Sequence, residues 1–236
     1  MKAVFHKASE RGHVNHGWLN AHHSFSFASY HNPSKVHFGL LRVLNDDIVA
    51  PGMGFGMHPH DNMEIVTIPL SGVLEHQDSM GNTGVIRPNE IQAMSAGSGL
   101  MHSEYNHSKT EPINLLQIWV FPKEQNITPR YEQLIFSEED KSGKFKTIVS
   151  PVKAKDVMWI NQDAYFSLGK FKASSSIDYS IQQKGNGAYI FIIEGSCLIN
   201  NNTLNKRDAI GIWDTDKFSI NITNDSEILI IEVPMN

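Results

Sequence analysis

The sequence lacks most of the features that define a secreted or membrane-bound protein. Its 236 residues include one cysteine, Cys197, so no disulfide can form within the chain and a reducing compartment is expected. The first ten residues contain no apolar signal-peptide segment, and no apolar run is long enough to cross a membrane. We therefore expect a cytoplasmic protein without a membrane partner.

An excess of basic residues is also missing. The chain carries 20 Lys and Arg against 25 Asp and Glu, a formal net charge of -5, which argues against direct binding to nucleic acid. A hydrophobic content of 40% and a charged content of 19% are those of an ordinary globular protein. A chain of this length can bury one large core or two small ones. We expect a monomer.

Histidine is absent from the second half of the chain. All 12 histidines lie at or before His107, so the remainder offers a transition metal only carboxylates and one thiol. We therefore expect one metal per chain, bound in the first half. Seven of the histidines fall within residues 1–37: His6, His13, His16, His22, His23, His31 and His37. No carboxylate or cysteine stands at matching spacing, so we expect these imidazoles to cap turns and to tie an irregular N-terminal arm to the fold.

Two pairs of metal-ligand residue types stand out in what is present. His58 and His60 are two positions apart, as are His102 and Glu104. Side chains two apart on a strand leave the same face, so each pair can grip one ion if both lie on strands. Three imidazoles and a carboxylate suit a first-row transition metal. Glu64 lies four residues past His60 and faces inward too if the strand is unbroken, so parity does not choose between Glu64 and Glu104.

Short apolar segments separated by frequent turns predict an all-β sandwich or barrel. Residues 38–44 read as a buried strand followed by an Asn-Asp-Asp turn at 45–47, and 137–143 as an exposed polar loop. Gly195 follows its apolar strand much as Gly72 follows an earlier one, which suggests a second barrel of the same kind. The strands expected in that second unit are 145–149, 164–171, 188–194, 197–199, 209–213, 218–222 and 228–233.

These motifs resemble those of a known family. Gly52, five residues, His58-Pro-His60, then Glu64 and Gly72 are similar to the first cupin motif, and His102 with Asn106 to the second. The residues within and around these motifs resemble those of the pirin family more closely still, in particular its bacterial members assigned as quercetin 2,3-dioxygenases. This resemblance is carried by Gly17-Trp18, Pro59-His-Asp-Asn-Met-Glu64, Glu75-His-Gln-Asp-Ser-Met-Gly81, Met94-Ser-Ala-Gly97 and Thr128-Pro-Arg-Tyr-Glu-Gln133. The match covers most of residues 11–135 and, more loosely, the rest.

The resemblance implies a bicupin, two tandem jelly-roll barrels with an N-terminal arm. Residues 1–135 would form the metal-binding barrel and residues 136–236 a cupin-like barrel without metal. Pirins hold their metal with three histidines and the glutamate of the second motif, which correspond here to His58, His60, His102 and Glu104. One departure is Pro88-Asn89, where cupins often have Pro-Gly; it should affect a turn and not the metal.

The resemblance also implies an activity, cleavage of the flavonol quercetin with dioxygen and release of carbon monoxide. Fe²⁺ fits this chemistry best among divalent metals, with Cu, Ni, Mn and Zn as alternatives. Glu104 is the candidate base for the flavonol 3-hydroxyl. Glu64 and His76 are candidates to orient a ligand imidazole. Candidates for the pocket wall are Phe55, Met57, Met101, Gln117 and Trp119.

Two other functions stay open at this point. One is a metal-dependent binding or regulatory protein, as the eukaryotic pirins are thought to be. The other is a cupin isomerase or hydrolase that uses zinc as a Lewis acid. The lack of a basic patch and the bacterial type of the motifs favour the dioxygenase.

Overall fold

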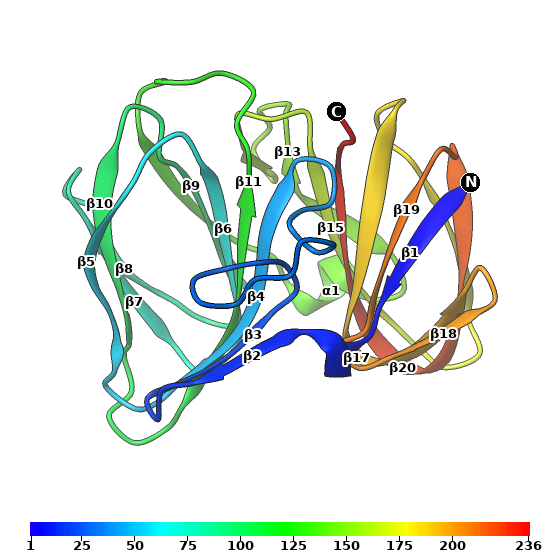
Figure 1. The fold of residues 1–236 in the computed structure, drawn as a ribbon, viewed down its shortest axis with the longest axis horizontal. Coiled ribbons are helices and arrows are strands. Elements are labelled where there is room, and N and C mark those ends of the chain that lie inside the picture. The colour runs from blue at the N-terminus through cyan, green and yellow to red at the C-terminus, as the bar shows by residue number, and fades with distance from the viewer.

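Two barrel-shaped β units lie side by side in the computed structural model, which describes residues 1–236 (Figure 1). Only two short helices interrupt the strands, the 3-10 helix η1 (Ala8–Glu10) and α1 (Glu138–Lys141). Neither helix is long and apolar enough to cross a membrane. The architecture confirms the predicted all-β bicupin with an N-terminal arm.

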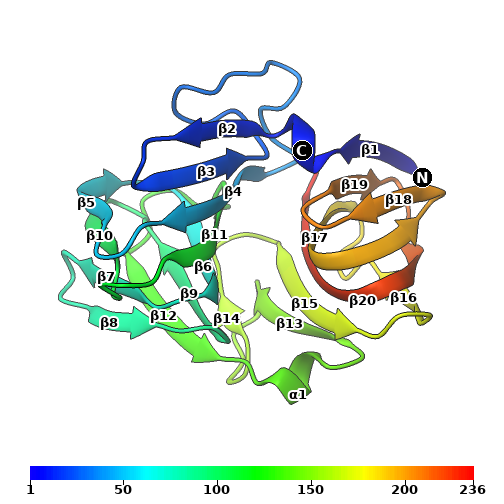
Figure 2. The same cartoon turned by 90° about the horizontal axis from the view of Figure 1, so that it is seen from below.

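The N-terminal unit is formed by two antiparallel sheets. Its four-stranded sheet has the order β5 (Gly54–His60), β10 (Leu100–Asn106), β7 (Leu74–Asp78) and β8 (Thr83–Ile86). Its seven-stranded sheet has the order β12 (Arg130–Ile135), β9 (Glu90–Ser95), β6 (Glu64–Ser71), β11 (Ile113–Val120), β4 (Leu41–Val49), β3 (Leu19–His23) and β2 (Gly12–Asn15). The N-terminal arm is therefore not wholly irregular, since β2 and β3 extend this sheet (Figure 2).

The C-terminal unit is a single nine-stranded sheet. Its main path runs β1 (Lys2–His6), β19 (Ala209–Trp213), β17 (Asn186–Ile199), β20 (Lys217–Pro234), β15 (Tyr165–Phe171), β13 (Phe145–Ser150) and β14 (Met158–Trp159). β16 (Ser176–Ser180) pairs with β20, and β18 (Asn202–Asn205) pairs with β17. The division of the chain into domains at residue 135 stays a prediction. One strand from the first part of the chain lies in the sheet of the second. β1 belongs to the C-terminal sheet, because it pairs with β19 along its whole length.

Three local predictions are corrected by the strands. Residues 45–47 are not a turn but the middle of β4, and all three are buried. The segments 188–194 and 197–199 belong to one strand, β17, and 218–222 and 228–233 to another, β20. Gly195 sits at a bulge in β17 with φ of +82°, so the backbone bends there without ending the strand.

The predicted loop at 137–143 contains α1, whose Lys141 is buried. Its Nζ donates to Oδ1 of Asn89 at 2.6 Å. Asn89 adopts a left-handed φ of +71°, a conformation that asparagine tolerates better than most residues. The Pro88-Asn89 departure from the cupin pattern thus gives a turn, as expected, and the asparagine side chain also anchors the helix.

The hydrophobic core is continuous between the two units. A cluster of 26 buried residues includes Val66 and Ile118 from the first unit and Phe166, Tyr189 and Leu229 from the second. A second cluster of 15 residues fills the C-terminal barrel. The interior of the N-terminal barrel holds smaller apolar clusters of seven and four residues, and polar side chains occupy much of the remaining space.

Candidate metal centre

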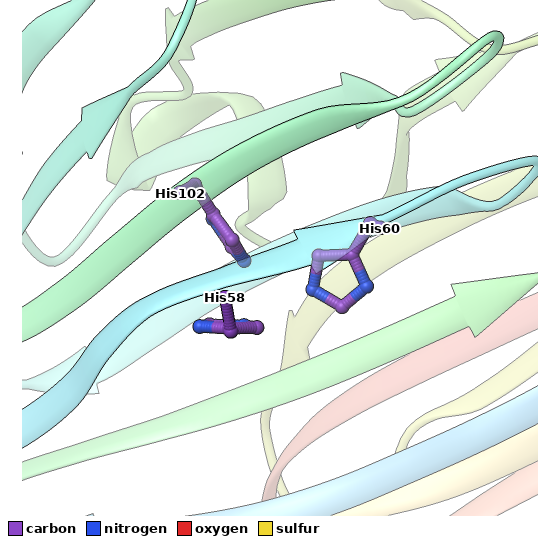
Figure 3. A group of neighbouring side chains, drawn as sticks. All are labelled: His58, His60 and His102. Carbon is purple, nitrogen blue, oxygen red and sulfur yellow. The ribbon is translucent and has the colours of Figure 1, made fainter.

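Three histidines meet inside the N-terminal barrel. β5 and β10 pair antiparallel with His102 opposite His58, and His60 lies two positions along β5 on the same face. The three ring centroids are 4.5 to 4.9 Å apart, and one ring nitrogen from each lies within 4.8 Å of the others. Figure 3 shows the rings turned toward one another from the two strands. The period-two reasoning therefore places these three side chains together as predicted.

The surroundings of these imidazoles suit a metal ion. Nδ1 of His58 donates to the carbonyl of Gly56 at 2.7 Å, which leaves Nε2 with a lone pair. His102 is fully buried, and neither of its ring nitrogens has a hydrogen-bond partner. An unpaired buried nitrogen is costly unless something binds it. Burial, with the neighbouring imidazoles, lowers the pKa of His60 to about 4 and that of His102 to about 2, so both stay neutral and able to coordinate.

Glu104 lies beside His102 and not at the centre of the three rings. Its Oε2 accepts a hydrogen bond from Nε2 of Gln117 at 2.8 Å, and its Oε1 accepts one from Oγ1 of Thr67 at 3.4 Å. A second group of close ligand atoms joins Glu104 with His102 and His76. Complete burial raises the pKa of Glu104 to about 7, although both hydrogen bonds act in the opposite direction. Burial thus favours the neutral form of this carboxyl group as long as no cation lies beside it.

His76 stands behind His102 with both of its nitrogens engaged. Nε2 lies 3.4 Å from Oδ2 of Asp78, and Nδ1 lies 3.1 Å from Nε2 of Gln92. Its ring stacks on Tyr131 at 4.8 Å and lies 5.4 Å from the ring of His102. These contacts fix His76 as a packed support for His102, and a metal would have to displace them to use it as a ligand.

Glu64 does not lie where strand alternation would have made it a metal ligand. β5 ends at His60, Asn62 takes a left-handed φ of +43°, and Glu64 begins β6 in the other sheet. Its Oε2 accepts from Oγ of Ser95 at 2.7 Å and from the backbone N of Asn161 at 3.0 Å. The structure therefore brings Glu64 neither to the histidine cluster nor to an imidazole that it could orient.

A pocket of about 450 Å³ opens onto the histidine cluster. Three of the five predicted wall residues line it, Phe55, Gln117 and Trp119. Met57 and Met101 do not, and both are exposed at 48% and 43%. Their positions have the opposite parity to His58 and His102, so strand alternation itself turns them outward.

The pocket also has walls that sequence reasoning missed. Trp18 and Phe27 of the N-terminal arm line it, and each contacts an aromatic ring of the barrel, Phe55 at 5.3 Å and Trp119 at 5.4 Å. Asn45 and Asp47 line it from β4. Asn45 and Asp47 could have been found from the sequence, because residues 45–47 are three polar residues inside an apolar strand pattern. We interpreted this run as a turn.

The remaining histidines of the arm form no group of three ligand atoms. Nδ1 of His6 lies 2.9 Å from the hydroxyl of Tyr189 in the C-terminal unit, and Nδ1 of His23 lies 2.8 Å from Oδ1 of Asn45. His13 and His22 stack on each other across β2 and β3 at 4.5 Å. The side-chain contacts of these four residues agree with the interpretation that imidazoles fasten the arm.

The two barrels and the histidine cluster define a bicupin with a candidate metal centre in its N-terminal barrel. A family model described as Pirin matches residues 4–120, and one described as the quercetinase C-terminal cupin domain matches residues 147–233. The chain belongs to the pirin family.

Relatives are similar to this protein in sequence along nearly the whole chain. Quercetin 2,3-dioxygenase of Escherichia coli strain K12 is 43% identical over 229 residues, 97% of each chain. A pirin-like protein of Caulobacter vibrioides is 39% identical over 94% of this chain and 95% of its own. Among solved structures, the bacterial pirin YhhW of Escherichia coli in complex with nickel(II) superposes with a TM-score of 0.93 at 40% identity, covering 99% of each chain.

Proposed function

We propose that this protein is a quercetin 2,3-dioxygenase-type oxidoreductase that cleaves a flavonol with dioxygen and releases carbon monoxide. The observation that carries the proposal is the histidine cluster. Both nitrogens of buried His102 lack a hydrogen-bond partner, one ring nitrogen of each histidine lies within 4.8 Å of the others, and His58 and His60 line an aromatic-walled pocket. The name and the 43% identity of the Escherichia coli relative support the same activity.

The residues that would hold the metal are His58, His60, His102 and Glu104. Three neutral imidazoles and one carboxylate suit Fe²⁺, which we propose as the physiological ion. When bound, it supplies the redox chemistry and open coordination positions that an oxygenase needs for substrate and dioxygen.

The protein contributes the position of the substrate and the movement of one proton. The aromatic rings of Trp18, Phe27, Phe55 and Trp119 form walls that can hold a flat polycyclic ligand and exclude water. Glu104, which lines the pocket, is the group we propose to accept the proton of the flavonol 3-hydroxyl, and loss of that proton raises the electron density of the ring. General-base catalysis of this kind contributes on the order of 10²–10⁴ in rate.

The test is carbon monoxide release from quercetin in air by iron-reconstituted protein. His60→Ala removes one ring of the cluster, and His16→Ala is a matched control because His16 is an exposed histidine of the arm. We expect stoichiometric release by the wild type and by His16→Ala, and loss of release by His60→Ala. Equal release by all three would mean free-metal oxidation and would refute the site.

The same assay separates the competing functions. No carbon monoxide from wild-type protein with iron confirmed bound would favour a metal-dependent binding protein. Full activity on a substrate with zinc in place of iron would favour a Lewis-acid isomerase or hydrolase. A monomeric state and a cytoplasmic location stay predictions, the first testable by light scattering of the purified chain.

A further inference from the structure

The floor of the pocket contains a buried acid that nothing in the protein pairs. Asp47 lies on β4, is 4% exposed and lines the pocket. Its Oδ1 is buried without a hydrogen-bond partner, and no hydrogen bond to the carboxyl group contributes to its pKa. Asp47 belongs to neither group of potential metal-ligand atoms, so the metal centre does not account for it.

The preceding residue of β4, Asp46, shows that this strand does not leave every buried acid unpaired. Asp46 points to the opposite face, where Arg11 and Arg207 lie 3.3 and 2.9 Å from its Oδ2 and Asn114 donates to its Oδ1 at 2.8 Å. The same strand therefore satisfies one buried carboxylate fully and leaves the next one, which lines the pocket, without a hydrogen bond. Leaving a buried polar group unpaired destabilises the protein unless a ligand binds it.

We propose that Asp47 is a specificity-determining residue that hydrogen-bonds a phenolic hydroxyl of the substrate, one other than the group that faces the metal centre. This rests on the proposed function, because it takes the ligand to be a flavonol. Asn45, two positions along the same face, adds a side-chain amide whose Oδ1 already bonds His23, so its Nδ2 is a second polar contact for the ligand.

The surroundings favour a neutral hydroxyl over a charged ligand. No Lys or Arg pairs with Asp47, and the pocket walls are mostly aromatic. Burial, together with the charges of Asp46 and Glu104, raises the pKa of Asp47 to about 8, so the side chain is largely a neutral acid at pH 7. A neutral carboxylic acid both donates and accepts, which matches the two-way hydrogen bonding of a phenol.

The experiment compares two flavonols that differ only in ring hydroxyls, quercetin and unsubstituted 3-hydroxyflavone. Nickel(II)-loaded protein is titrated with each in the absence of oxygen, and binding is followed by quenching of tryptophan fluorescence, to which Trp18 and Trp119 of the pocket contribute. The variants are Asp47→Leu and Asp47→Asn. Ile48→Ala is the control, since Ile48 is the next residue of β4 and is 41% exposed.

We expect Asp47→Leu to weaken quercetin binding about tenfold or more and to leave 3-hydroxyflavone binding within about twofold. Asp47→Asn should lose less, because the amide still hydrogen-bonds, and it guards against a leucine variant that fails to fold. Equal weakening for both flavonols, or no weakening for either, would overturn the assignment of Asp47 while the proposed function stood. If the wild type bound neither flavonol, the proposed function and this inference would both fail.

Discussion

Replacing Glu64 by glutamine tests the cost of a buried carboxyl group between the two units. Glu64 is 1% exposed, and its Oε1 has no hydrogen-bond partner. Ser95 and the backbone of Asn161 donate to Oε2, the latter from beyond the N-terminal unit. Burial is the dominant influence, and it raises the pKa of Glu64 from 4.5 to about 7.

The sign and size of the effect follow from proton linkage. Below pH 4.5 the carboxyl is protonated in both the folded and the unfolded chain, so its pKa difference has no effect on stability. Between pH 4.5 and about 7 the unfolded chain ionises while the folded protein keeps its proton, so the free energy of unfolding falls as pH rises. One pKa unit corresponds to about 1.4 kcal/mol, which makes the full loss about 3 kcal/mol above pH 7.

Glutamine has no proton to lose, so Glu64→Gln removes this pH dependence. Urea unfolding of wild type and variant at pH 5 and pH 8 measures it, because the difference between the two proteins cancels the other titrating groups. We expect the variant to gain about 2–3 kcal/mol relative to the wild type between the two pH values. A difference that does not change with pH would refute the reasoning. Metal binding should be unaltered, since Glu64 is not part of the histidine cluster.

Three further predictions concern other parts of the molecule. Asp46→Asn should lower the free energy of unfolding by about 3 kcal/mol, since the buried charges of Arg11 and Arg207 would lose their carboxylate partner. Denaturant unfolding measures this free energy, and a decrease below about 1 kcal/mol would contradict the prediction. For Glu104→Gln, the number of protons released when nickel(II) binds between pH 5 and 8 should fall by about one, because the metal-free carboxyl has a pKa of about 7. Isothermal titration calorimetry at several pH values measures how the affinity changes with pH, and an unchanged dependence would remove Glu104 from the ligand set. Gly195→Ala should lower the melting temperature by several degrees, as its Cβ would lie 2.1 Å from a backbone carbonyl oxygen at a φ of +82°; a variant as stable as the wild type would show that the bulge can relax.

The histidine cluster could be predicted from the sequence because its geometry is local. His58 and His60 share a strand face by the two-residue period alone, as do His102 and Glu104, and the pairing of β5 with β10 then brings the two faces together. Glu64 shows the limit of that rule. Parity holds only within a strand, and the left-handed turn before Glu64 moves it into another sheet.

The floor of the pocket could not be predicted because its explanation is not local. Asn45, Asp46 and Asp47 match a turn by composition, and only distant groups make them tolerable in a buried strand. Arg207 reaches Asp46 from more than 150 positions away in the sequence, and Asp47 faces a pocket whose walls come from separate elements. The same holds for the aromatic wall, which depends on how the arm folds over the barrel.

The pairing of β1 with β19 has a consequence for the order in which the protein is made. The residues of β1 leave the ribosome long before their partner strand, which begins at Ala209, so β1 must wait until some 200 further residues have been synthesised. The intervening N-terminal barrel can form during that delay. Docking of β1 then closes a loop of some 200 residues, a contact of long sequence separation that is intrinsically slow to form. A tag or fusion placed ahead of β1 would therefore lie beside the C-terminal barrel, although the other strands of that barrel are the farthest from it along the sequence.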